Sequence, residues 1–457
     1  MKTDYDILLD KYHDELIDSL KKFVSINSVY DEKTSSFEHP FGIGVSKALN
    51  FIHELAIKDG FKSINYGNKV VEILCGEQEK NITILAHADV VPEGEGWEQN
   101  PFEVVEKDGV LLGRGVADDK GPLLASYYAM KVLRDNNLLG NYQVRFIVGG
   151  NEESGSLGVE YYFNELKSKQ PTLGFSPDAE FPLIYAEKGI YTFEARTDLE
   201  LDGIISFKGG LAANSVIEKC ILSVEKNSKF LEIINQCKYP YSLADKGNNV
   251  EVIIQGVSAH GASPKFGKNA GVEALRLIAL ATNNEVISHI YDCLYDLEGR
   301  GLDAYCYSDN MECSSSMNVG IVNYDGKSLS IVINYRYVDT CNIDETKIKI
   351  ANKIAPFKIV SGGDSHLLFY KKDSDLVRIL LDSYQKETGD YDSKPMAIGG
   401  GTYAKEANNI IAFGAEFPGW NSNMHSIGEG MKKEHLFKAM SVYARAIVEL
   451  GKFIDEN

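Results

Sequence analysis

The sequence lacks paired cysteine motifs and long hydrophobic runs. Its seven cysteines form no Cys-x-x-Cys pair, and their number is odd. They lie mostly in apolar stretches, as buried free thiols do, so we expect a reducing cytoplasm. No apolar run approaches the roughly 20 residues that span a bilayer. The N-terminal segment Met1–Asp6 also lacks the basic and apolar regions of a secretory signal.

Basic residues are scarce relative to acidic ones. Lys and Arg number 47 and Asp and Glu number 66, which gives a net charge of −19. A chain this acidic lacks the basic face that neutralises phosphates, so we expect it to bind neither nucleic acid nor membranes. Its hydrophobic content of 44% and charged content of 25% are ordinary for a globular protein. A length of 457 residues predicts two or three domains.

The first part of the chain alternates helical and strand-like segments. The expected helices are Leu16–Val24, Val45–Ala56, Pro122–Leu133 and Leu157–Leu166, and the expected strands are Val70–Leu74, Ile82–Ala86 and Val144–Val148. This alternation predicts an α/β layer with a mainly parallel central sheet. Ligands of such sheets collect outside the carboxyl ends of the strands. His87 and Glu152 both follow strand-like runs, where that rule would place a site.

The pattern changes at about residue 188. Strand-like alternation is expected at Tyr191–Arg196, Val250–Gln255, Met317–Val322 and Leu329–Arg336, with a helix at Val272–Thr282. A helical pattern resumes near Ser374, in the segment that supplies His425. If His425 joins His87 at one site, this last segment must fold back onto the first. We therefore expect a catalytic domain in two parts, 1–187 and 371–457, interrupted by an inserted α+β domain, 188–370.

Side chains of the type that bind metals are dispersed over five segments. These segments are His87-Ala88-Asp89, Gly115–Gly121 with Asp118 and Asp119, Glu152-Glu153, Ser176-Pro177-Asp178, and His425. Imidazoles and carboxylates without thiolates suit Zn²⁺, Mn²⁺ or Co²⁺. Two histidines with several carboxylates exceed what one ion needs. The set therefore predicts a two-metal hydrolase.

Taken one at a time, these motifs are ordinary. The spacing of His87 and Asp89 puts both side chains on one face of an extended segment, where Asp89 can orient the imidazole through its far ring nitrogen. Glu152-Glu153 offers a metal ligand next to a general base, although an isolated pair is usually a solvated turn. A carboxylate before a helix is usually an N-cap. One of Asp118 and Asp119 can instead bridge two ions, and the residues alone do not say which.

Together the motifs resemble the M20 metallopeptidases. The resemblance rests on His-x-Asp at 87–89, Gly-Val-Ala-Asp-Asp-Lys-Gly at 115–121, Glu-Glu-Ser-Gly at 152–155 and Pro-Asp-Ala-Glu at 177–180. Within that family the similarity is greatest to the monomeric bacterial dipeptidases of the PepV type, which are related to carnosinase. It implies a zinc-peptidase-like α/β catalytic domain and, in the insert, a lid domain. The implied metal ligands are His87, Asp118 as the bridging ligand, Glu153, Asp178 and His425.

The resemblance also implies catalytic and substrate-binding roles. Glu152 would be the general base that takes a proton from a bridging water, Asp89 would orient His87, and His260 in the Gly-rich lid motif would stabilise the oxyanion. The implied substrate-binding residues are Asn214, Arg336, Gly400, Gly401 and Thr402. An Arg fork suits the free carboxylate of a dipeptide.

The expected activity is therefore metal-dependent hydrolysis of dipeptides with a free N-terminus. Two divalent ions are expected, Zn²⁺ or Mn²⁺ with Co²⁺ also acceptable, and the large insert implies a monomer. A deacylase acting on N-acyl amino acids keeps the same metals with another substrate. A third hypothesis is a binding protein without turnover. The intact set of metal ligands and the presence of Glu152 argue against it. Lys405, where the family often has Arg, leaves the substrate preference open.

Overall fold

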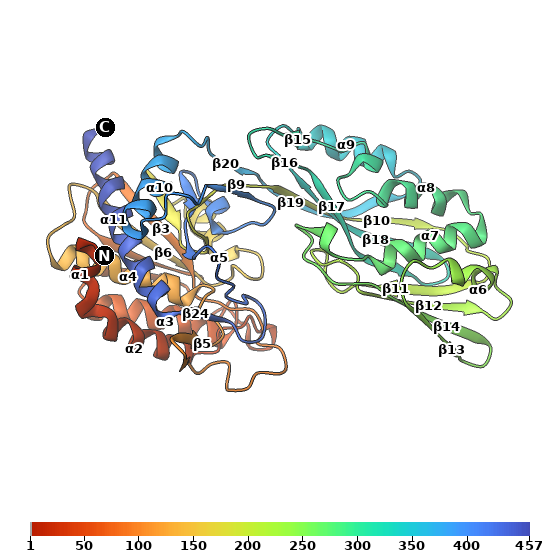
Figure 1. The fold of residues 1–457 in the computed structure, drawn as a ribbon, viewed down its shortest axis with the longest axis horizontal. Helices are drawn as coiled ribbons and strands as arrows, with labels where there is room; N and C mark the ends of the chain where they lie inside the picture. Colours follow the sequence, from red (N-terminus) through yellow and green to blue (C-terminus); the bar gives the residue numbers. More distant parts are fainter. Residues whose placement is uncertain (1) are drawn as a thin grey trace. The chain divides into compact units, whose positions relative to one another are not determined.

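The structure is a computed structural model that describes residues 2–457, and the chain folds as two compact units (Figure 1). The first unit contains the described residues up to Tyr185 together with Tyr370–Met396 and Thr402–Asn457. The second contains Ala186–Phe369 and the short segment Ala397–Gly401. The chain thus leaves the first unit and returns to it twice.

A mixed sheet forms the centre of the first unit. Its strands run in the order β1 (Lys62–Tyr66), β2 (Val70–Cys75), β6 (Gln143–Gly149), β3 (Asn81–His87), β7 (Leu173–Ser176), β22 (Ile410–Ala412) and β9 (Ile184–Glu187). The neighbours from β6 to β22 are parallel, whereas β1, β2 and β9 join antiparallel. Strand β3 is buried along its whole length, as expected of a parallel strand covered on both faces. The sheet is therefore parallel only across its centre.

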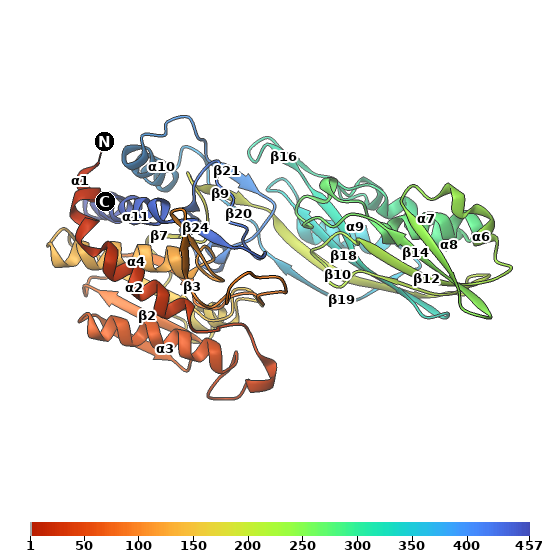
Figure 2. The ribbon, with the colours of Figure 1, turned by 60° about the horizontal axis from the view of Figure 1, so that its bottom comes forward.

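Helices cover this sheet, and their buried faces explain their positions. They are α1 (Asp4–Leu9), α2 (His13–Val24), α3 (Ile43–Lys58), α4 (Lys120–Asp135), α5 (Leu157–Glu160), α10 (Asp375–Thr388) and α11 (Lys433–Glu456). Helices α4 and α11 pack beside each other and against β3 (Figure 2). Pro122 lies in the first turn of α4, where its missing N–H costs no hydrogen bond.

Two small sheets complete the first unit. The three-stranded sheet β24 (Gly430–Lys432), β5 (Val110–Leu112) and β4 (Val105–Lys107) joins the C-terminal segment to the first part of the chain. Strands β8 (Ala179–Glu180) and β23 (Ala415–Glu416) form a parallel pair. These pairings fold the returning segment back onto the first, which the hypothesis of a shared site requires.

The second unit is an antiparallel sheet with helices on it (Figure 1). Its strand order is β13 (Tyr241–Asp245), β14 (Asn249–Gln255), β12 (Lys219–Glu225), β11 (Ile204–Gly209), β17 (Ser316–Tyr324), β18 (Ser328–Tyr337), β10 (Gly189–Asp198) and β19 (Lys358–Ser365). Its helices are α6 (Lys229–Ile233), α7 (Ala270–Thr282), α8 (Glu285–Leu294) and α9 (Ile343–Lys353). Alternate residues of the strands pack against these helices in one core, which contains Phe193, Leu222, Ile278 and Ile290.

The remaining strands are short. Strand β20 (Leu368–Phe369) and strand β21 (Met396–Ile398) each pair with β9, and β15 (Tyr307–Ser308) pairs with β16 (Cys313–Ser314). The seven cysteines are free, and Cys75, Cys220 and Cys293 are buried. In residues 2–457 no helix combines the length and the apolar character needed to cross a membrane.

Most expected elements are confirmed, with three corrections. Each expected helix or strand coincides with an observed one to within a few residues, except that the helix expected at Leu157–Leu166 is α-helical only to Glu160 and continues as a π-helix over Tyr161–Glu165. The prediction of an α/β chain is confirmed. The second correction concerns the central sheet, which we expected to be mainly parallel but which is parallel only from β6 to β22 and antiparallel toward both edges. The third correction concerns Ala397–Gly401, which packs with the second unit although we expected it in the final catalytic part.

Candidate metal centre

One edge of the first unit's sheet collects most of the expected ligands. His87 is the last residue of β3 and lies opposite Gly149, the last residue of β6. Glu152 and Glu153 follow β6, and Asp178 follows β7. Because β6, β3 and β7 are parallel, their carboxyl ends meet at the same edge. The topology therefore gathers side chains that are far apart in the sequence.

The carboxylate of Asp118 lies between two histidines. Its Oδ1 is 3.0 Å from Nε2 of His87, and its Oδ2 is 2.8 Å from Nε2 of His425. Asp118 is buried, and it stands in the loop that enters α4. A carboxylate that presents one oxygen to each histidine has the geometry of a ligand shared by two ions.

Two further carboxylates lie near the two histidines, one beside each. Asp178 Oδ2 lies 3.7 Å from Nε2 of His87, and Glu153 Oε2 lies 3.2 Å from Nε2 of His425. Donor atoms of His87, Glu152 and Asp178 all lie within 4.8 Å of one another, as do those of His87, Asp118 and Glu153. His87 is fully buried, whereas the His425 side chain is about half exposed.

The electrostatics of this cluster show crowded negative charge. Burial, with the nearby Asp178 carboxylate second, raises the pKa of Glu152 well above its usual range. Burial also raises the pKa of Asp178 to about 7, and Asp118 adds to the shift. Burial alone would raise the pKa of Asp118, but hydrogen bonds from His425 and His87 outweigh it and hold that pKa below its usual range. Cations placed among these carboxylates would relieve their mutual repulsion.

The donor set fits two divalent ions. It offers imidazole nitrogens and carboxylate oxygens without sulfur, which is the chemistry of Zn²⁺, Mn²⁺ and Co²⁺ sites. Oε1 of Glu153 is buried without a hydrogen-bond partner among the described residues. A buried carboxylate oxygen without a partner is costly unless a ligand satisfies it. The residues present therefore suit the metals that the motifs predicted.

Asp89 contacts more of the site than the sequence indicated. Nδ1 of His87 lies 3.0 Å from the carbonyl oxygen of Asp89 and 3.4 Å from its carboxylate. The carboxylate accepts hydrogen bonds of 3.1 Å from the backbone N–H groups of both Glu152 and Glu153. Asp89 therefore holds the Glu-Glu turn as well as the imidazole.

Comparison with known proteins shows to which family the chain belongs. The family described as peptidase family M20/M25/M40 matches residues 83–449. A protein of Staphylococcus aureus (strain MW2) with the provisional name of dipeptidase is 33% identical over 465 residues, which cover 97% of this chain and 98% of that protein. The chain belongs to the M20 peptidase family. This confirms the resemblance seen in the motifs, and the protein is a metallopeptidase.

Solved structures agree with this M20 fold. Human carnosine dipeptidase 1 aligns with a TM-score of 0.61 at 14% identity, over 98% of both chains. The dipeptidase Dug1p of Saccharomyces cerevisiae aligns with a TM-score of 0.59, also at 14% identity and over 98% of both chains. At this identity the similarity supports the fold alone.

In the second unit of this M20 peptidase, Asn214 and His260 lie on neighbouring segments. The N–H of Gly261 donates to the carbonyl of Asn214 over 2.7 Å, and Ser215 forms a β-bridge with His260. Both side chains are exposed. The structure thus brings these two predicted residues together on one surface.

Arg336 lies beside the glycine loop in the same unit. Its Nε donates to Oδ1 of Asn334 over 2.9 Å, and its Nη1 donates to the carbonyl oxygen of Gly399. Gly400 and Gly401 follow directly in the second unit, whereas Thr402 begins the returning segment of the first and accepts a hydrogen bond from Ala404 N–H. The predicted substrate-binding residues are therefore divided between the units.

Three residues support the ligands, and of these the sequence indicated only Asp119, as a candidate ligand and not as a support. The backbone N–H of His87 donates to Oδ2 of Asp119 over 3.1 Å, and the buried ring of Tyr403 lies edge-on to the imidazole, 5.8 Å between centroids. Glu429 is buried against the loop that carries Asp118. Only its position four residues after His425 offered a signal in the sequence.

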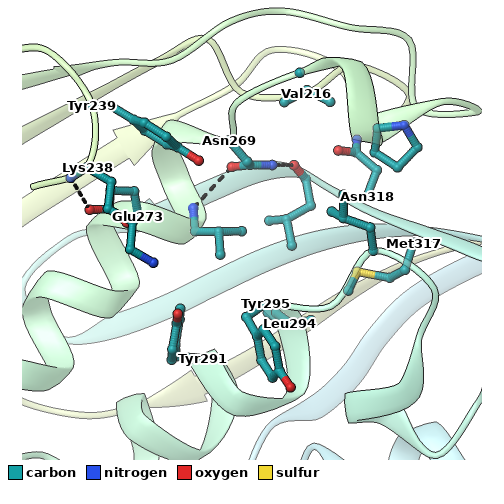
Figure 3. A pocket seen from close by; sticks show the side chains of 15 residues that line it. Val216, Lys238, Tyr239, Asn269, Glu273, Tyr291, Leu294, Tyr295, Met317 and Asn318 are labelled. Atoms are coloured by element: carbon teal, nitrogen blue, oxygen red, sulfur yellow. Dashed lines mark hydrogen bonds between the residues drawn. The ribbon is translucent and has the colours of Figure 1, made fainter.

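A separate pocket in the second unit contains none of the predicted residues (Figure 3). It has a volume of about 220 Å³ and is lined by residues that include Glu273 and the rings of Tyr239, Tyr291 and Tyr295. The Glu273 carboxylate already accepts hydrogen bonds from the Lys238 N–H and from Arg276. The pocket therefore offers no open carboxylate of the kind found at the metal centre.

Proposed function

We propose that this M20 peptidase hydrolyses dipeptides with a free N-terminus and uses two divalent ions, Zn²⁺ or Mn²⁺, with Co²⁺ also suited. The observation that carries the proposal is the Asp118 carboxylate between His87 and His425. His87 and Asp178 would hold one ion, Glu153 and His425 the other, and Asp118 both. The dipeptidase names of similar proteins support the choice of substrate.

Glu152 is proposed as the general base. Bound ions would acidify a water and polarise the scissile carbonyl. Burial among carboxylates raises the pKa of Glu152 above its usual range, which suits a group that first accepts a proton and then returns it to the leaving amine. Asp89 would fix its direction, because the Asp89 carboxylate binds the backbone N–H of Glu152.

The second unit is proposed as a lid that supplies His260 and Asn214 to the substrate. His260 would stabilise the negative charge that develops on the carbonyl oxygen. Closure of such a unit would exclude water from the reaction. We also propose a cytoplasmic monomer, on the grounds that the cysteines are free and that the chain carries its own His260.

Arg336 is proposed to bind the substrate carboxylate. It is 3% exposed, and burial lowers its pKa to about 10. Its hydrogen-bond partners are the neutral oxygens of Asn334 and Gly399, and within residues 2–457 no carboxylate pairs with it. A buried guanidinium without an anion is costly. An anionic group of the substrate would supply the missing charge.

Replacing Arg336 by Met is expected to raise KM for dipeptides by about 30-fold or more, with a smaller effect on kcat, since charge-assisted hydrogen bonds contribute about 2 kcal/mol or more. Dipeptide amides, which lack the carboxylate, should show no such penalty. Steady-state kinetics with the paired substrates measure this difference.

Arg196→Met is the matched control. Arg196 lies on β10 in the same sheet, but its side chain is 53% exposed and paired with Glu194. Arg196→Met should leave KM and kcat unchanged for both the dipeptide and the dipeptide amide. An equal loss on dipeptide and dipeptide amide in Arg336→Met would contradict carboxylate recognition and indicate a general disturbance of the unit.

A substrate panel tests the reaction itself. The metal-loaded protein is expected to cleave unblocked dipeptides and to leave N-acetyl and N-succinyl amino acids intact. Preference for the acylated compounds would replace the proposal with the deacylase alternative. Absence of turnover on both, with two ions bound, would indicate a binding protein.

A further inference from the structure

We propose that Glu429 and Arg114 form a clamp that positions the Asp118 loop and the His425 segment as metal ligands. This inference rests on the two-ion site of the proposed function. It assigns a positioning role to two buried residues that contact each other and the backbone of the ligand-bearing segments. The clamp acts through the backbone, so its effect is on the placement of Asp118 and His425.

One oxygen of Glu429 holds the loop that carries Asp118. Oε1 accepts hydrogen bonds from three backbone N–H groups, those of Gly115 at 2.9 Å, Ala117 at 3.0 Å and Asp118 at 3.2 Å. Three donors on one carboxylate oxygen fix the path of the loop up to the bridging ligand itself. Glu429 is 1% exposed, so water does not compete for these bonds.

The other oxygen of Glu429 meets Arg114. Nη1 of Arg114 lies 2.6 Å from Oε2, and both side chains are 1% exposed. Nη2 of Arg114 reaches the carbonyl oxygens of Pro92 and Glu93, each at 3.3 Å. These carbonyls belong to the segment that follows His87 and Asp89. The ion pair therefore connects three ligand-bearing parts of the chain.

The backbone around Glu429 holds the His425 loop. The N–H of Gly430 donates to the carbonyl of Ser422 over 2.9 Å, which closes the loop that contains His425. The N–H of Gly113 donates to the carbonyl of Glu429 over 3.0 Å, and Gly430 pairs with Leu112. The base of the His425 loop is thus fixed to the start of the Asp118 loop.

A structural ion pair and a positioning clamp predict different results. Loss of one partner of any buried pair leaves an uncompensated charge and destabilises the fold. Only a clamp also changes metal affinity in protein that remains folded. Partners that orient metal ligands typically contribute 10–100-fold to metal affinity.

The test is titration of metal-free protein with Zn²⁺, and separately with Mn²⁺, by calorimetry well below the unfolding temperature. Glu429→Gln keeps the size of the side chain but removes the charge that faces Arg114. We expect it to weaken binding of at least one ion by 10-fold or more. Glu106→Gln is the matched control, because Glu106 pairs with Lys433 at 3.0 Å, also joins the C-terminal segment to the first part of the chain, and is partly exposed. It should stay within about twofold of wild type, as exposed ion pairs do.

Hydrogen exchange provides a readout that needs neither metal nor activity. Peptides that cover residues 113–119 should lose protection in Glu429→Gln and keep it in Glu106→Gln. If Glu429→Gln does not fold, Glu429→Asp replaces it in the test, because Asp keeps the charge but does not reach as far toward the loop. Metal affinity and the protection of residues 113–119 should both fall in this variant too. Wild-type metal affinity together with wild-type protection in either folded variant would overturn the clamp.

The clamp and the proposed function fail in distinguishable ways. A wild-type protein that binds two ions but cleaves no dipeptide refutes the function, and the metal titration of Glu429→Gln still decides the clamp. A wild-type dipeptidase whose Glu429→Gln variant binds metal normally refutes the clamp alone. At saturating metal, Glu429→Gln should recover activity with an unchanged KM, which a substrate-contacting residue would not do.

Discussion

Glu152→Gln is expected to lower kcat on dipeptides by about a thousandfold while two metal ions remain bound. General acid–base catalysis contributes about 10²–10⁴-fold, and a thousandfold loss corresponds to about 4 kcal/mol. The amide of Gln has nearly the same shape but accepts no proton at neutral pH. Single-turnover kinetics with metal analysis of the same sample measure both quantities.

The neighbouring residue supplies a matched comparison. Glu152 and Glu153 each donate a backbone N–H to Asp89 over the same 3.1 Å, so their backbone support is equivalent. Glu153 Oε2 lies 3.2 Å from His425, and we propose it as a ligand. Glu153→Gln should therefore lose metal affinity and recover part of its activity at high metal concentration.

Added metal should not rescue Glu152→Gln. A variant of Glu152 with two bound ions and wild-type kcat would refute its role as the base. A variant that loses metal as Glu153→Gln does would reassign Glu152 as a ligand. The two neighbouring glutamates thus separate proton transfer from metal binding.

Elements with strong periodicity could be predicted from the sequence. Helix α4 combines helical apolar spacing with a proline in its first turn, and β10 alternates buried and partly exposed residues. The hairpin strand β1 escaped prediction because it is a largely polar edge strand without a fully buried residue. The π-helix after Glu160 was also missed, since apolar spacing does not reveal a change in the hydrogen-bond ladder.

The order of strands could not be read from local pattern. Strand β22 pairs with β7 although the whole second unit separates them in the sequence. Only the hypothesis that His425 joins His87 indicated such a return. The pairing of strands that are distant in the sequence depends on the complete core. His425, as a candidate metal ligand, therefore indicated the return of the last segment better than the hydropathy pattern did.

The candidate ligands could be named from the sequence, whereas their supports could not. His87, Asp118 and His425 belong to residue types that metals require, and their motifs drew attention to them. Glu429 lies in an ordinary loop sequence, and only its burial and three backbone donors reveal its contacts. Support through the backbone leaves no side-chain pattern to recognise.

The residues alone leave open whether Asp118 or Asp119 bridges the two ions. Asp118→Asn is expected to lower the affinity for both ions by more than about a hundredfold, beyond the range typical of residues that only orient ligands. Hydrolysis of dipeptides should fall with it to the level of metal-free protein. The reason is that Asp118 alone presents one oxygen to each histidine.

Asp119→Asn is the control that makes this outcome specific. Asp119 is also buried, but its Oδ2 accepts the backbone N–H of His87, and an amide oxygen can accept the same bond. It should therefore keep two ions, within the 10–100-fold range of an orienting partner. Calorimetric stoichiometry of the two variants decides the assignment. If Asp118→Asn bound two ions and Asp119→Asn bound none, Asp119 would be the shared ligand. The two carboxylates would then have to turn, because in the structure Asp118 is the one that lies between the histidines. If only Asp118→Asn lost both ions, Asp118 would be the ligand that the two ions share. No other single substitution at this edge of the sheet should remove both ions.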